Sequence, residues 1–316
     1  MKNVFVHVAA AAILNDKGEV LVSQRKQDTH LGGYWEFPGG KLEPGETVEG
    51  ALARELAEEL DIVLLSGRPL IRTRHRYAEK SVLLDVWRVD SYRGQPRGVE
   101  GQNIAWRRIR QLDPSQFPPA DVPIINALWL PSRYLITGLF SSVGDFSQRL
   151  ARALDDGIEL VQLRLTQELL ADMTQAEVEA IVGQCTELSQ RYSARVLMNL
   201  PERYNRLITQ GIHLNSRSLL RAQHRPAYPL VSASCHNRQE LEHAQSIGAD
   251  FAVLSPVRRT RSHPDAIPLG WEEFQQLVDA CDIPVYALGG MTLDDLPTAW
   301  QSGAQGIAAI GAFWGV

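Results

Sequence analysis

Cysteine is scarce in this sequence, and its three occurrences (Cys185, Cys235 and Cys281) are widely spaced and odd in number. Neither a disulfide framework nor a cysteine-based zinc site has that spacing, so we expect reduced core residues. No apolar run reaches the roughly 20 residues that span a bilayer, which argues against a membrane-spanning helix. Basic runs are also missing and the net charge is −5, so a surface for a nucleic-acid polymer is not indicated. We expect a cytoplasmic protein with no membrane partner.

What is present suits a globular protein: 44% of the residues are hydrophobic and 22% are charged. The 316 residues are enough for two domains or one large barrel. The first part, residues 1–130, has the pattern of strands, one strong helix over 47–60, further strands and a last helix from about Val122, which is an α+β arrangement. The alternating start VFVHV and the apolar residues 6–14 and 19–25, separated by turn residues Asn15–Gly18, predict an N-terminal β-hairpin.

After Pro131 the pattern changes to short apolar runs, each followed by a helical or small-residue segment. Strand–helix alternation implies parallel pairing, and eight units imply a closed (β/α)8 barrel over residues 131–316, although an open doubly wound sheet is the alternative. The predicted fold class is therefore α/β, an α+β unit followed by a TIM barrel. The eight predicted strands are 133–138, 160–165, 195–200, 211–215, 231–235, 251–256, 284–290 and 306–311.

Glu55, Glu58 and Glu59 lie close together on the predicted helix over 47–60, where like charges repel by roughly 0.2–0.5 kcal/mol per pair. Taken alone, the three glutamates are typical of a solvated surface helix. A hard divalent cation would offset the repulsion, because Mg²⁺ prefers carboxylate and water oxygens. The glycine-rich stretch PGGKLEPGE before the helix lets its backbone approach a metal or a diphosphate closely.

The full string resembles the signature of the Nudix family, G-x5-E-x7-R-E-U-x-E-E-x-G-U. Its fixed positions are filled by Gly40, Glu46 and the run Arg54-Glu55-Leu56-Ala57-Glu58-Glu59, with Ile62 at the last aliphatic position. Asp61 replaces the family's glycine, and we expect it to end the helix in the left-handed conformation. The MutT branch of the family is most similar, through WEFPGGKLEPGE, VEGQ at 99–102 and FPPAD at 117–121.

This resemblance implies a hydrolase that acts on diphosphate bonds and converts a nucleoside triphosphate to the monophosphate and pyrophosphate. It implies Mg²⁺, with Mn²⁺ as the alternative, bound by Glu55, Glu58, Glu59, Glu100 and the carbonyl of Gly39. One of the catalytic carboxylates Glu55, Glu58 and Glu59, with Glu55 as the first candidate, would also orient or deprotonate water. Two further residues would have structural roles: Arg54 would hold the glutamates by an ion pair, and Glu46 would brace the loop.

The MutT resemblance also implies a nucleotide-pool function close to DNA repair, with 8-oxo-dGTP as the favoured small-molecule substrate. Arg25 would contact the nucleotide and Phe37 would line the base pocket, although an edge-strand charge and a core ring are equally consistent roles for them. The family's purine-reading asparagine is Asp121 here. An ionised carboxylate only accepts hydrogen bonds, whereas an amide also donates, so Asp121 bears directly on substrate choice.

Residues 133–316 resemble the thiamine-phosphate synthase family and its relative TenI, through VQLRL, GIHLN, SASCH, VLSPVRRTRSHPDAIPLGW, ALGGM and GIAAIGAFW. The synthase's metal-binding aspartates correspond to positions near Leu200 and Ser218, so we do not expect synthase activity. Gly289, Gly290 and Gly311 would hold the phosphate of a phosphorylated ligand at the barrel's strand ends, although tight strand–helix turns would equally explain these glycines. Three histidines are candidates for proton transfer, with His236 ahead of His213 and His263, and a hydrogen-bonded structural role is the alternative for His236.

Two further interpretations of the whole chain stay open. The Nudix half could hydrolyse a thiamine-pathway pyrophosphate, with the barrel binding or tautomerising the same class of metabolite. Alternatively, the barrel could be a non-catalytic sensing or scaffolding domain. The sequence does not predict the oligomeric state.

Overall fold

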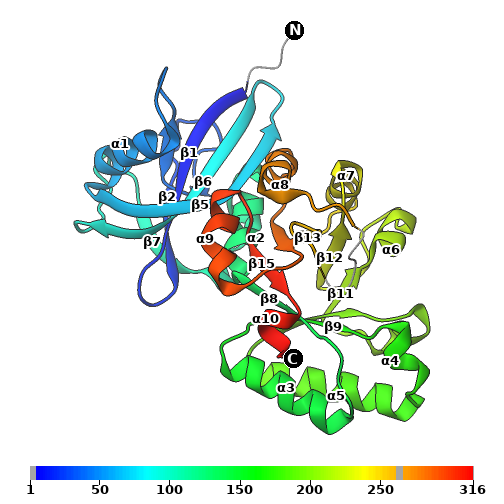
Figure 1. The fold of residues 1–316 in the computed structure, drawn as a ribbon. Helices are drawn as coiled ribbons and strands as arrows, with labels where there is room; N and C mark the ends of the chain where they lie inside the picture. The colour runs from blue at the N-terminus through cyan, green and yellow to red at the C-terminus, as the bar shows by residue number, and fades with distance from the viewer. Residues whose placement is uncertain (1–4, 261–265, 316) are drawn as a thin grey trace. The chain divides into compact units, whose positions relative to one another are not determined.

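The structure is a computed structural model that describes residues 5–260 and 266–315. The chain divides into two compact units, Met1–Trp129 and Leu130–Val316. Figure 1 shows the first unit from blue through cyan to blue-green, and the second from green through yellow to red. Each unit has hydrophobic clusters of its own.

The N-terminal unit is built from two sheets. One has the strand order β4-β1-β6-β5 and the other has the order β3-β2-β7. The strands are β1 (Phe5–Ile13), β2 (Glu19–Gln24), β3 (Trp35–Glu36), β4 (Gly39–Lys41), β5 (Val63–Arg76), β6 (Ser81–Arg93) and β7 (Ile104–Arg108). The helical segments are α1 (Val48–Leu60), η1 (Ile109–Gln111), η2 (Pro114–Gln116), η3 (Pro119–Asp121) and α2 (Val122–Trp129).

The predicted N-terminal hairpin is wrong in its pairing. The turn forms, and the N–H of Gly18 donates to the carbonyl of Asn15 at 3.0 Å. However, β1 pairs with β4 and β6, whereas β2 pairs with β3 and β7, and in the described part of the chain the ends of the two strands meet at a single Leu14–Val20 bridge. The cause is the run 9–12 of four alanines, which is buried on both faces of its sheet, so that β1 is a central strand.

Helix α1 forms as the sequence predicts. Thr47 caps its start, because its hydroxyl accepts a hydrogen bond from Gly50 N–H at 3.1 Å. Asp61 ends it with φ 57° and ψ 40°, which confirms the left-handed terminator. Its apolar side chains are fully buried on the sheet, and they are Ala51, Leu52, Leu56 and Leu60. The glutamates are thereby held on the neighbouring face.

The second unit is a closed barrel of eight parallel strands, which confirms the predicted fold. Its strands are β8 (Arg133–Ile136), β9 (Leu160–Arg164), β10 (Arg195–Asn199), β11 (Gly211–Leu214), β12 (Leu230–Cys235), β13 (Phe251–Leu254), β14 (Val285–Leu288) and β15 (Gly306–Ala309). The connecting helices are α3 (Val143–Asp155), α4 (Gln167–Ala171), α5 (Gln175–Arg191), α6 (Ser216–Arg221), α7 (Arg238–Ser246), α8 (Gly270–Val278), α9 (Leu296–Gln301) and α10 (Gly311–Trp314). The 3-10 segments are η4 (Glu202–Leu207), which joins β10 to β11, and η5 (Leu293–Asp295).

Aromatic rings fill the middle of the barrel. Tyr134, Phe251 and Tyr286 contact one another with ring centroids 5.3–5.5 Å apart. All three cysteines are buried, as predicted. Within residues 5–260 and 266–315, no helix is long and apolar enough to cross a membrane.

Candidate active site

Arg54 organises the carboxylates at the surface of α1. Its Nε and Nη2 donate to the two carboxylate oxygens of Glu46 at 3.0 and 2.9 Å, and Nη1 donates to Glu55 at 2.8 Å. Nη2 also donates to the carbonyl of Lys41 on β4 at 3.1 Å. The hydrogen bonds from Arg54 lower the pKa of Glu46, helped by the backbone N–H of Glu43. Loop, strand and helix are therefore held together by one guanidinium.

The absence of a side chain on Gly40 leaves the space that the Glu55 carboxylate occupies. A Cβ atom on Gly40 would lie 2.0 Å from Oε1 of Glu55 and 2.2 Å from its Cδ. Only a residue without a side chain lets the Glu55 carboxylate lie against β4. The Glu55 side chain is 15% exposed, so its carboxylate is largely shielded from solvent.

Glu59 lies one turn further along α1, where its Oε2 accepts a hydrogen bond from the N–H of Gly39 at 3.2 Å. Burial raises the pKa of Glu59 to about 7, and the nearby carboxylates of Glu55, Glu36 and Glu100 raise it further against the lowering effect of that hydrogen bond. The site thus concentrates negative charge that the protein's own cations only partly balance.

Glu58 and Glu100 are the more exposed members of the predicted metal set. Glu58 is 59% exposed, with a 3.4 Å contact to Arg54. Glu100 is 52% exposed and pairs with Lys26 at 3.1 Å. Among the described residues, no group of three or more His, Cys, Asp or Glu side chains is close enough to hold a metal ion.

The donor chemistry nevertheless fits a hard divalent cation. The carboxylates of Glu55 and Glu100 repel the carboxylate of Glu59. Such repulsion is relieved when a cation is bound between carboxylates. Arg54 donates to Oε1 of Glu55 and Lys26 donates to Oε2 of Glu100, so the other oxygen of each carboxylate could bind a cation. The metal roles of Gly39, Glu55, Glu58, Glu59 and Glu100 therefore stay predictions.

A second group of charges lies where the sequence predicts the nucleotide pocket. Arg25, directly after β2, forms a close ion pair with Glu36 of β3 through Nη1. Its Nε donates to the carbonyl of His30 at 2.8 Å. Arg25 is therefore held on two sides, and its predicted role in contacting the nucleotide stays a prediction.

Phe37 and Asp121 meet at the same place. The Phe37 ring is 5% exposed and stacks on Phe117 with centroids 5.7 Å apart, so it belongs to the core as well as to the predicted pocket. The Asp121 side chain accepts a hydrogen bond from the backbone N–H of Phe37 and is near both Arg25 and Glu36. The structure therefore brings the three predicted substrate-binding residues together.

Asp121 is buried, with 7% of its surface exposed. Burial and then the Glu36 carboxylate raise the pKa of Asp121 to about 8, although Arg25 and the Phe37 N–H act in the opposite direction. A protonated carboxyl donates one hydrogen bond and accepts others, much as an amide does. This differs from the expectation of an ionised group that only accepts.

Sequence reasoning missed Glu36 and Tyr77. Tyr77 follows β5, lies near Asp121 and accepts a hydrogen bond from the backbone N–H of Ala120. Its ring contacts His75 and His30 edge-on, at 4.5 and 5.4 Å between centroids. Glu36 lies within the stretch WEFPGGKLEPGE, whose resemblance was the signal that could have found it, and nothing local in the sequence indicated Tyr77.

In the barrel, His236 directly follows β12, at the carboxyl end of the strands. Its Nδ1 lies 2.8 Å from the carbonyl of Ser255, which only accepts, so Nδ1 carries a proton. In a neutral ring Nε2 is then the basic nitrogen. The backbone N–H of His236 donates to Glu240 at 2.7 Å, which fixes the residue at the start of α7.

The predicted phosphate-holding glycines share this end of the barrel but differ in their surroundings. Gly289 has φ +108° and Gly290 has φ +67°, and added Cβ atoms would lie 3.0 Å from Pro256 and from the carbonyl of Arg259 respectively. An added Cβ on Gly311 would meet nothing within 4 Å. The first two glycines are thus needed for the local backbone, whereas Gly311 borders open space.

His213 lies inside the barrel and away from solvent. Nδ1 is 2.7 Å from the hydroxyl of Ser232, and Nε2 is 2.7 Å from that of Ser234. Burial, together with Arg164, lowers the pKa of His213 to about 3, so it is neutral and part of a polar network with Tyr134. The sequence did not predict this network. His263 lies outside the described residues.

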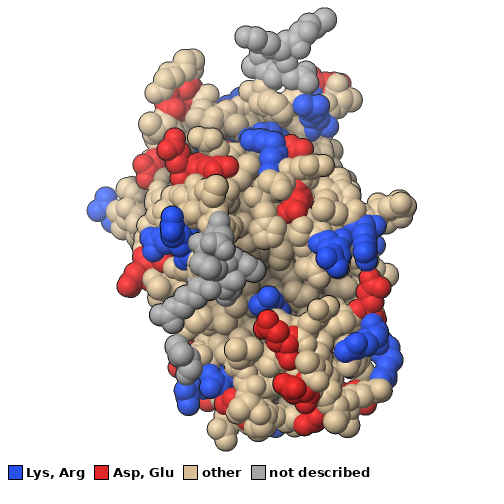
Figure 2. Space-filling view, turned by 45° about the vertical axis from the view of Figure 1, so that its right-hand side comes forward, with Lys and Arg blue, Asp and Glu red and all other residues tan. Residues whose placement is uncertain are grey.

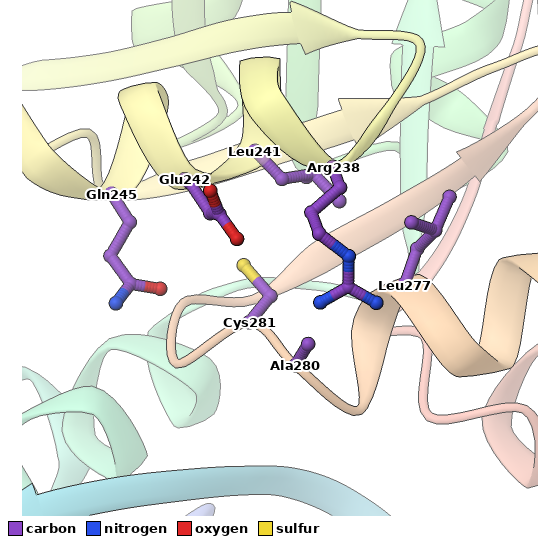
Figure 3. A pocket seen from close by; sticks show the side chains of 7 residues that line it. All are labelled: Arg238, Leu241, Glu242, Gln245, Leu277, Ala280 and Cys281. Carbon is purple, nitrogen blue, oxygen red and sulfur yellow. The ribbon is translucent and has the colours of Figure 1, made fainter.

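A hollow of about 80 Å³ between α7 and α8, lined by Arg238, Glu242 and Cys281 among others, is far smaller than the roughly 300 Å³ of a ligand pocket (Figure 3). On the face drawn in Figure 2, the acidic and basic side chains of the described residues are interspersed. That face has no continuous basic surface of the kind that binds a phosphate backbone.

In comparisons with known proteins, the two units of the chain match different families. Residues 9–127 match the model of the NUDIX domain, and residues 133–313 match that of thiamine monophosphate synthase. The chain is 35% identical to the 8-oxo-dGTP diphosphatase of Escherichia coli over 39% of its own length and 95% of that protein. It is 33% identical to the CTP pyrophosphohydrolase of the same organism, over 37% of the chain and 87% of that protein. It is 32% identical to a putative thiamine-phosphate synthase 2 of Aquifex aeolicus, over 58% of the chain and 98% of that protein.

The fold and the site thus define a two-part protein, a Nudix hydrolase unit followed by a barrel. The chain belongs to the Nudix family through its N-terminal unit and to the thiamine monophosphate synthase/TenI family through its barrel. Its N-terminal unit is a Nudix pyrophosphohydrolase of the diphosphatase kind.

Proposed function

We propose that the N-terminal unit hydrolyses oxidised purine nucleoside triphosphates, 8-oxo-dGTP foremost, to the monophosphate and pyrophosphate with Mg²⁺ as cofactor. The observation that carries this proposal is Glu59, a shielded carboxylate bound to the N–H of Gly39 and surrounded by other carboxylates. Bound Mg²⁺ would neutralise the phosphate charge and lower the pKa of a coordinated water. The identity of 35% with an 8-oxo-dGTP diphosphatase supports the substrate.

The protein's own residues have separate tasks in this proposal. Arg54 holds the Glu55 carboxylate in one orientation, so that its free oxygen orients or deprotonates the attacking water. Gly39 and Gly40 let the diphosphate approach the backbone of β4. Asp121 and Phe37 bind the base. A protonated Asp121 can donate a hydrogen bond to O6 of an oxidised guanine, which is an acceptor.

The test is an assay of the full chain with Mg²⁺ against 8-oxo-dGTP, dGTP, CTP and thiamine-type diphosphates, with identification of the products. Preferred release of pyrophosphate from 8-oxo-dGTP supports the proposal. Turnover of thiamine-type diphosphates alone would favour the thiamine-pathway alternative, and turnover of CTP alone would favour a pyrimidine substrate. A Glu55→Gln variant with full activity would remove Glu55 from the proposed machinery.

A second activity is proposed for the barrel because the hydrogen bond to Ser255 leaves Nε2 of His236 as a base at the strand ends. His236 would move a proton on a phosphorylated ligand held near Gly311, as in a tautomerisation of a thiazole carboxylate phosphate. The matched comparison is His236→Ala against His224→Ala, since His224 is exposed. Equal tautomerisation rates in both variants would exclude His236, and ligand binding without turnover would favour a sensing role for the barrel.

A further inference from the structure

Lys26 is a cation that contacts the predicted metal site from outside the Nudix signature. It directly follows Arg25 in the loop between β2 and β3, and its Nζ donates to Oε2 of Glu100 at 3.1 Å. The two partners are 74 positions apart in the chain, so the fold alone brings them together. The proposed reaction does not yet use Lys26.

The backbone of Glu100 is fixed against the end of helix α1. The N–H of Val99 and Nε2 of Gln102 both donate to the carbonyl of Glu59 at 3.0 Å. The N–H of Glu100 itself donates to Oε1 of Gln102 at 2.9 Å. These contacts place Glu100 beside the last turn of α1, where the metal-binding glutamates are predicted. They restrain its backbone and leave its side chain to be oriented by another group.

Lys26 restrains that side chain. Glu100 is 52% exposed, and a metal ion that binds an exposed glutamate must restrict its rotamers at a cost in entropy. Lys26 is 47% exposed, but its carbonyl accepts hydrogen bonds from the N–H and the hydroxyl of Thr29 at 3.1 and 2.7 Å. The lysine side chain therefore starts from a defined turn. Its contact uses Oε2 of Glu100, so Oε1 can bind a cation.

Two other predicted ligands share this arrangement. Nη1 of Arg54 donates to Oε1 of Glu55 at 2.8 Å, and the N–H of Gly39 donates to Oε2 of Glu59 at 3.2 Å. In each carboxylate one oxygen is bound to a donor of the protein, and the other can face a metal ion. Such partners orient a ligand, and removing one typically costs roughly 10- to 100-fold in metal affinity.

We propose that Lys26 is a positioning residue of the metal site: by binding Oε2 of Glu100, it orients Oε1 of that carboxylate toward the bound cation. This inference rests on the proposed function, since it concerns the Mg²⁺ site of the same reaction. Because Lys26 lies in the loop that also carries Arg25, the contact joins the predicted nucleotide loop to the metal site.

Removing Lys26 has two effects of opposite sign on metal binding. Loss of the lysine charge removes a repulsion, which strengthens cation binding by roughly threefold at physiological salt. Loss of the contact releases the Glu100 carboxylate and weakens binding by roughly 10-fold, the lower end of the usual range, because both side chains are about half exposed. The second effect is larger, so Lys26→Met should weaken metal binding by roughly threefold overall.

The first experiment measures Mn²⁺ binding to the full-length protein without nucleotide, from the EPR signal of the free ion. We expect the Kd to rise in Lys26→Met and to stay near the wild-type value in Lys26→Arg, which keeps a donor for Glu100. The control Lys17→Met removes the charge of an exposed lysine and should also match the wild type. In a Glu100→Ala background, Lys26→Met should not raise the Kd further.

Three results of this experiment would overturn the inference. One is a wild-type protein that binds no Mn²⁺. Another is a Kd in Lys26→Met that is unchanged or lower than in the wild type, which would leave charge repulsion as the effect of the lysine. The third is an equal rise of the Kd in the presence and absence of the Glu100 side chain, which would show a merely structural role.

The second experiment follows hydrogen exchange of peptides that cover residues 25–34, with and without Mn²⁺. If Lys26 holds a metal-bound carboxylate, Mn²⁺ should slow exchange in this loop in the wild type and much less in Lys26→Met. Equal slowing in both proteins would contradict the role of Lys26. The expected Mn²⁺ results without hydrolysis of any nucleoside triphosphate would support that role and overturn the proposed function instead. Hydrolysis of 8-oxo-dGTP with an unchanged Kd in Lys26→Met would do the reverse.

Discussion

Gly40 and Glu55 are in direct contact across β4 and α1: an atom in the place of a Gly40 Cβ would lie 2.0 Å from Oε1 of Glu55. Gly40→Ala should therefore push the Glu55 carboxylate out of its position without changing any charge. Because a displacement of about 1 Å can cost about 100-fold in rate, we expect kcat for 8-oxo-dGTP to fall by about that factor. The control is Gly183→Ala in α5, where the added methyl meets nothing within 4 Å. A Gly40→Ala variant within twofold of the wild-type kcat would contradict the assigned geometry.

Arg54 is expected to be irreplaceable by lysine. An ammonium group cannot reproduce the paired hydrogen bonds to Glu46 together with those to Glu55 and the Lys41 carbonyl. Loss of such supporting contacts typically costs roughly 10- to 100-fold in activity, and we expect a kcat decrease of that size in Arg54→Lys. Arg97→Lys serves as the matched control, because Arg97 is 73% exposed. Equal rates in the two variants would show that the frame around Arg54 does not position Glu55.

Asp121 should make the N-terminal unit less stable as the pH rises. Burial raises the pKa of Asp121 from 3.8 to about 8, so its protonated form favours folding. Its contribution is fully present below about pH 3.8 and is lost as the pH rises through about 8. Asp121→Asn removes this titration. Hydrogen exchange of N-terminal peptides should show that the variant loses less protection than the wild type between pH 5 and pH 8.5. Parallel losses in both proteins would place the titrating group elsewhere.

His213 should make the barrel less stable as the pH falls, which is the opposite of the effect of Asp121. Its pKa is lowered from 6.5 to about 3, mainly by burial, so its neutral form favours folding. That contribution is present above about pH 6.5 and is lost as the pH falls toward 3. His213→Asn should flatten the acid-induced loss of barrel protection in hydrogen exchange. At pH 7 the variant should be less stable by about 1–3 kcal/mol, because Ser232 and Ser234 lose well-placed partners.

The comparison for His213 is His224→Asn, since His224 is exposed. That variant should match the wild type at every pH. Acid sensitivity that persists unchanged in His213→Asn would show that another group controls the stability of the barrel at low pH.

Some of this architecture could be predicted from the sequence because it depends on local chemistry. Helix α1, its Thr47 cap and its Asp61 terminator follow from residues within one or two turns of each other. The eight barrel strands were evident because parallel strands buried on both faces are continuous apolar runs. The Nudix signature likewise placed the glutamates on one short segment with fixed spacing.

Other features depend on contacts between distant residues and left no local pattern. The pairing of β1 with β6 instead of β2 is decided by burial of alanines on both faces of a sheet. Glu36 and Tyr77 reach Asp121 only in the folded chain. The polar network around His213 joins residues from separate strands of the barrel. The protonation of Asp121 follows from burial, which composition alone does not reveal.

The most direct measurement of the central claim is the ratio of kcat/KM for 8-oxo-dGTP to that for dGTP at pH 7 with Mg²⁺. A site that uses hydrogen bonds to the oxidised base should give a ratio of roughly 100 or more, with monophosphate and pyrophosphate as products. The same preparation carrying Glu59→Gln should hydrolyse neither nucleotide. A ratio near one, or turnover only of CTP or thiamine-type diphosphates, would contradict a preference for oxidised purine nucleotides.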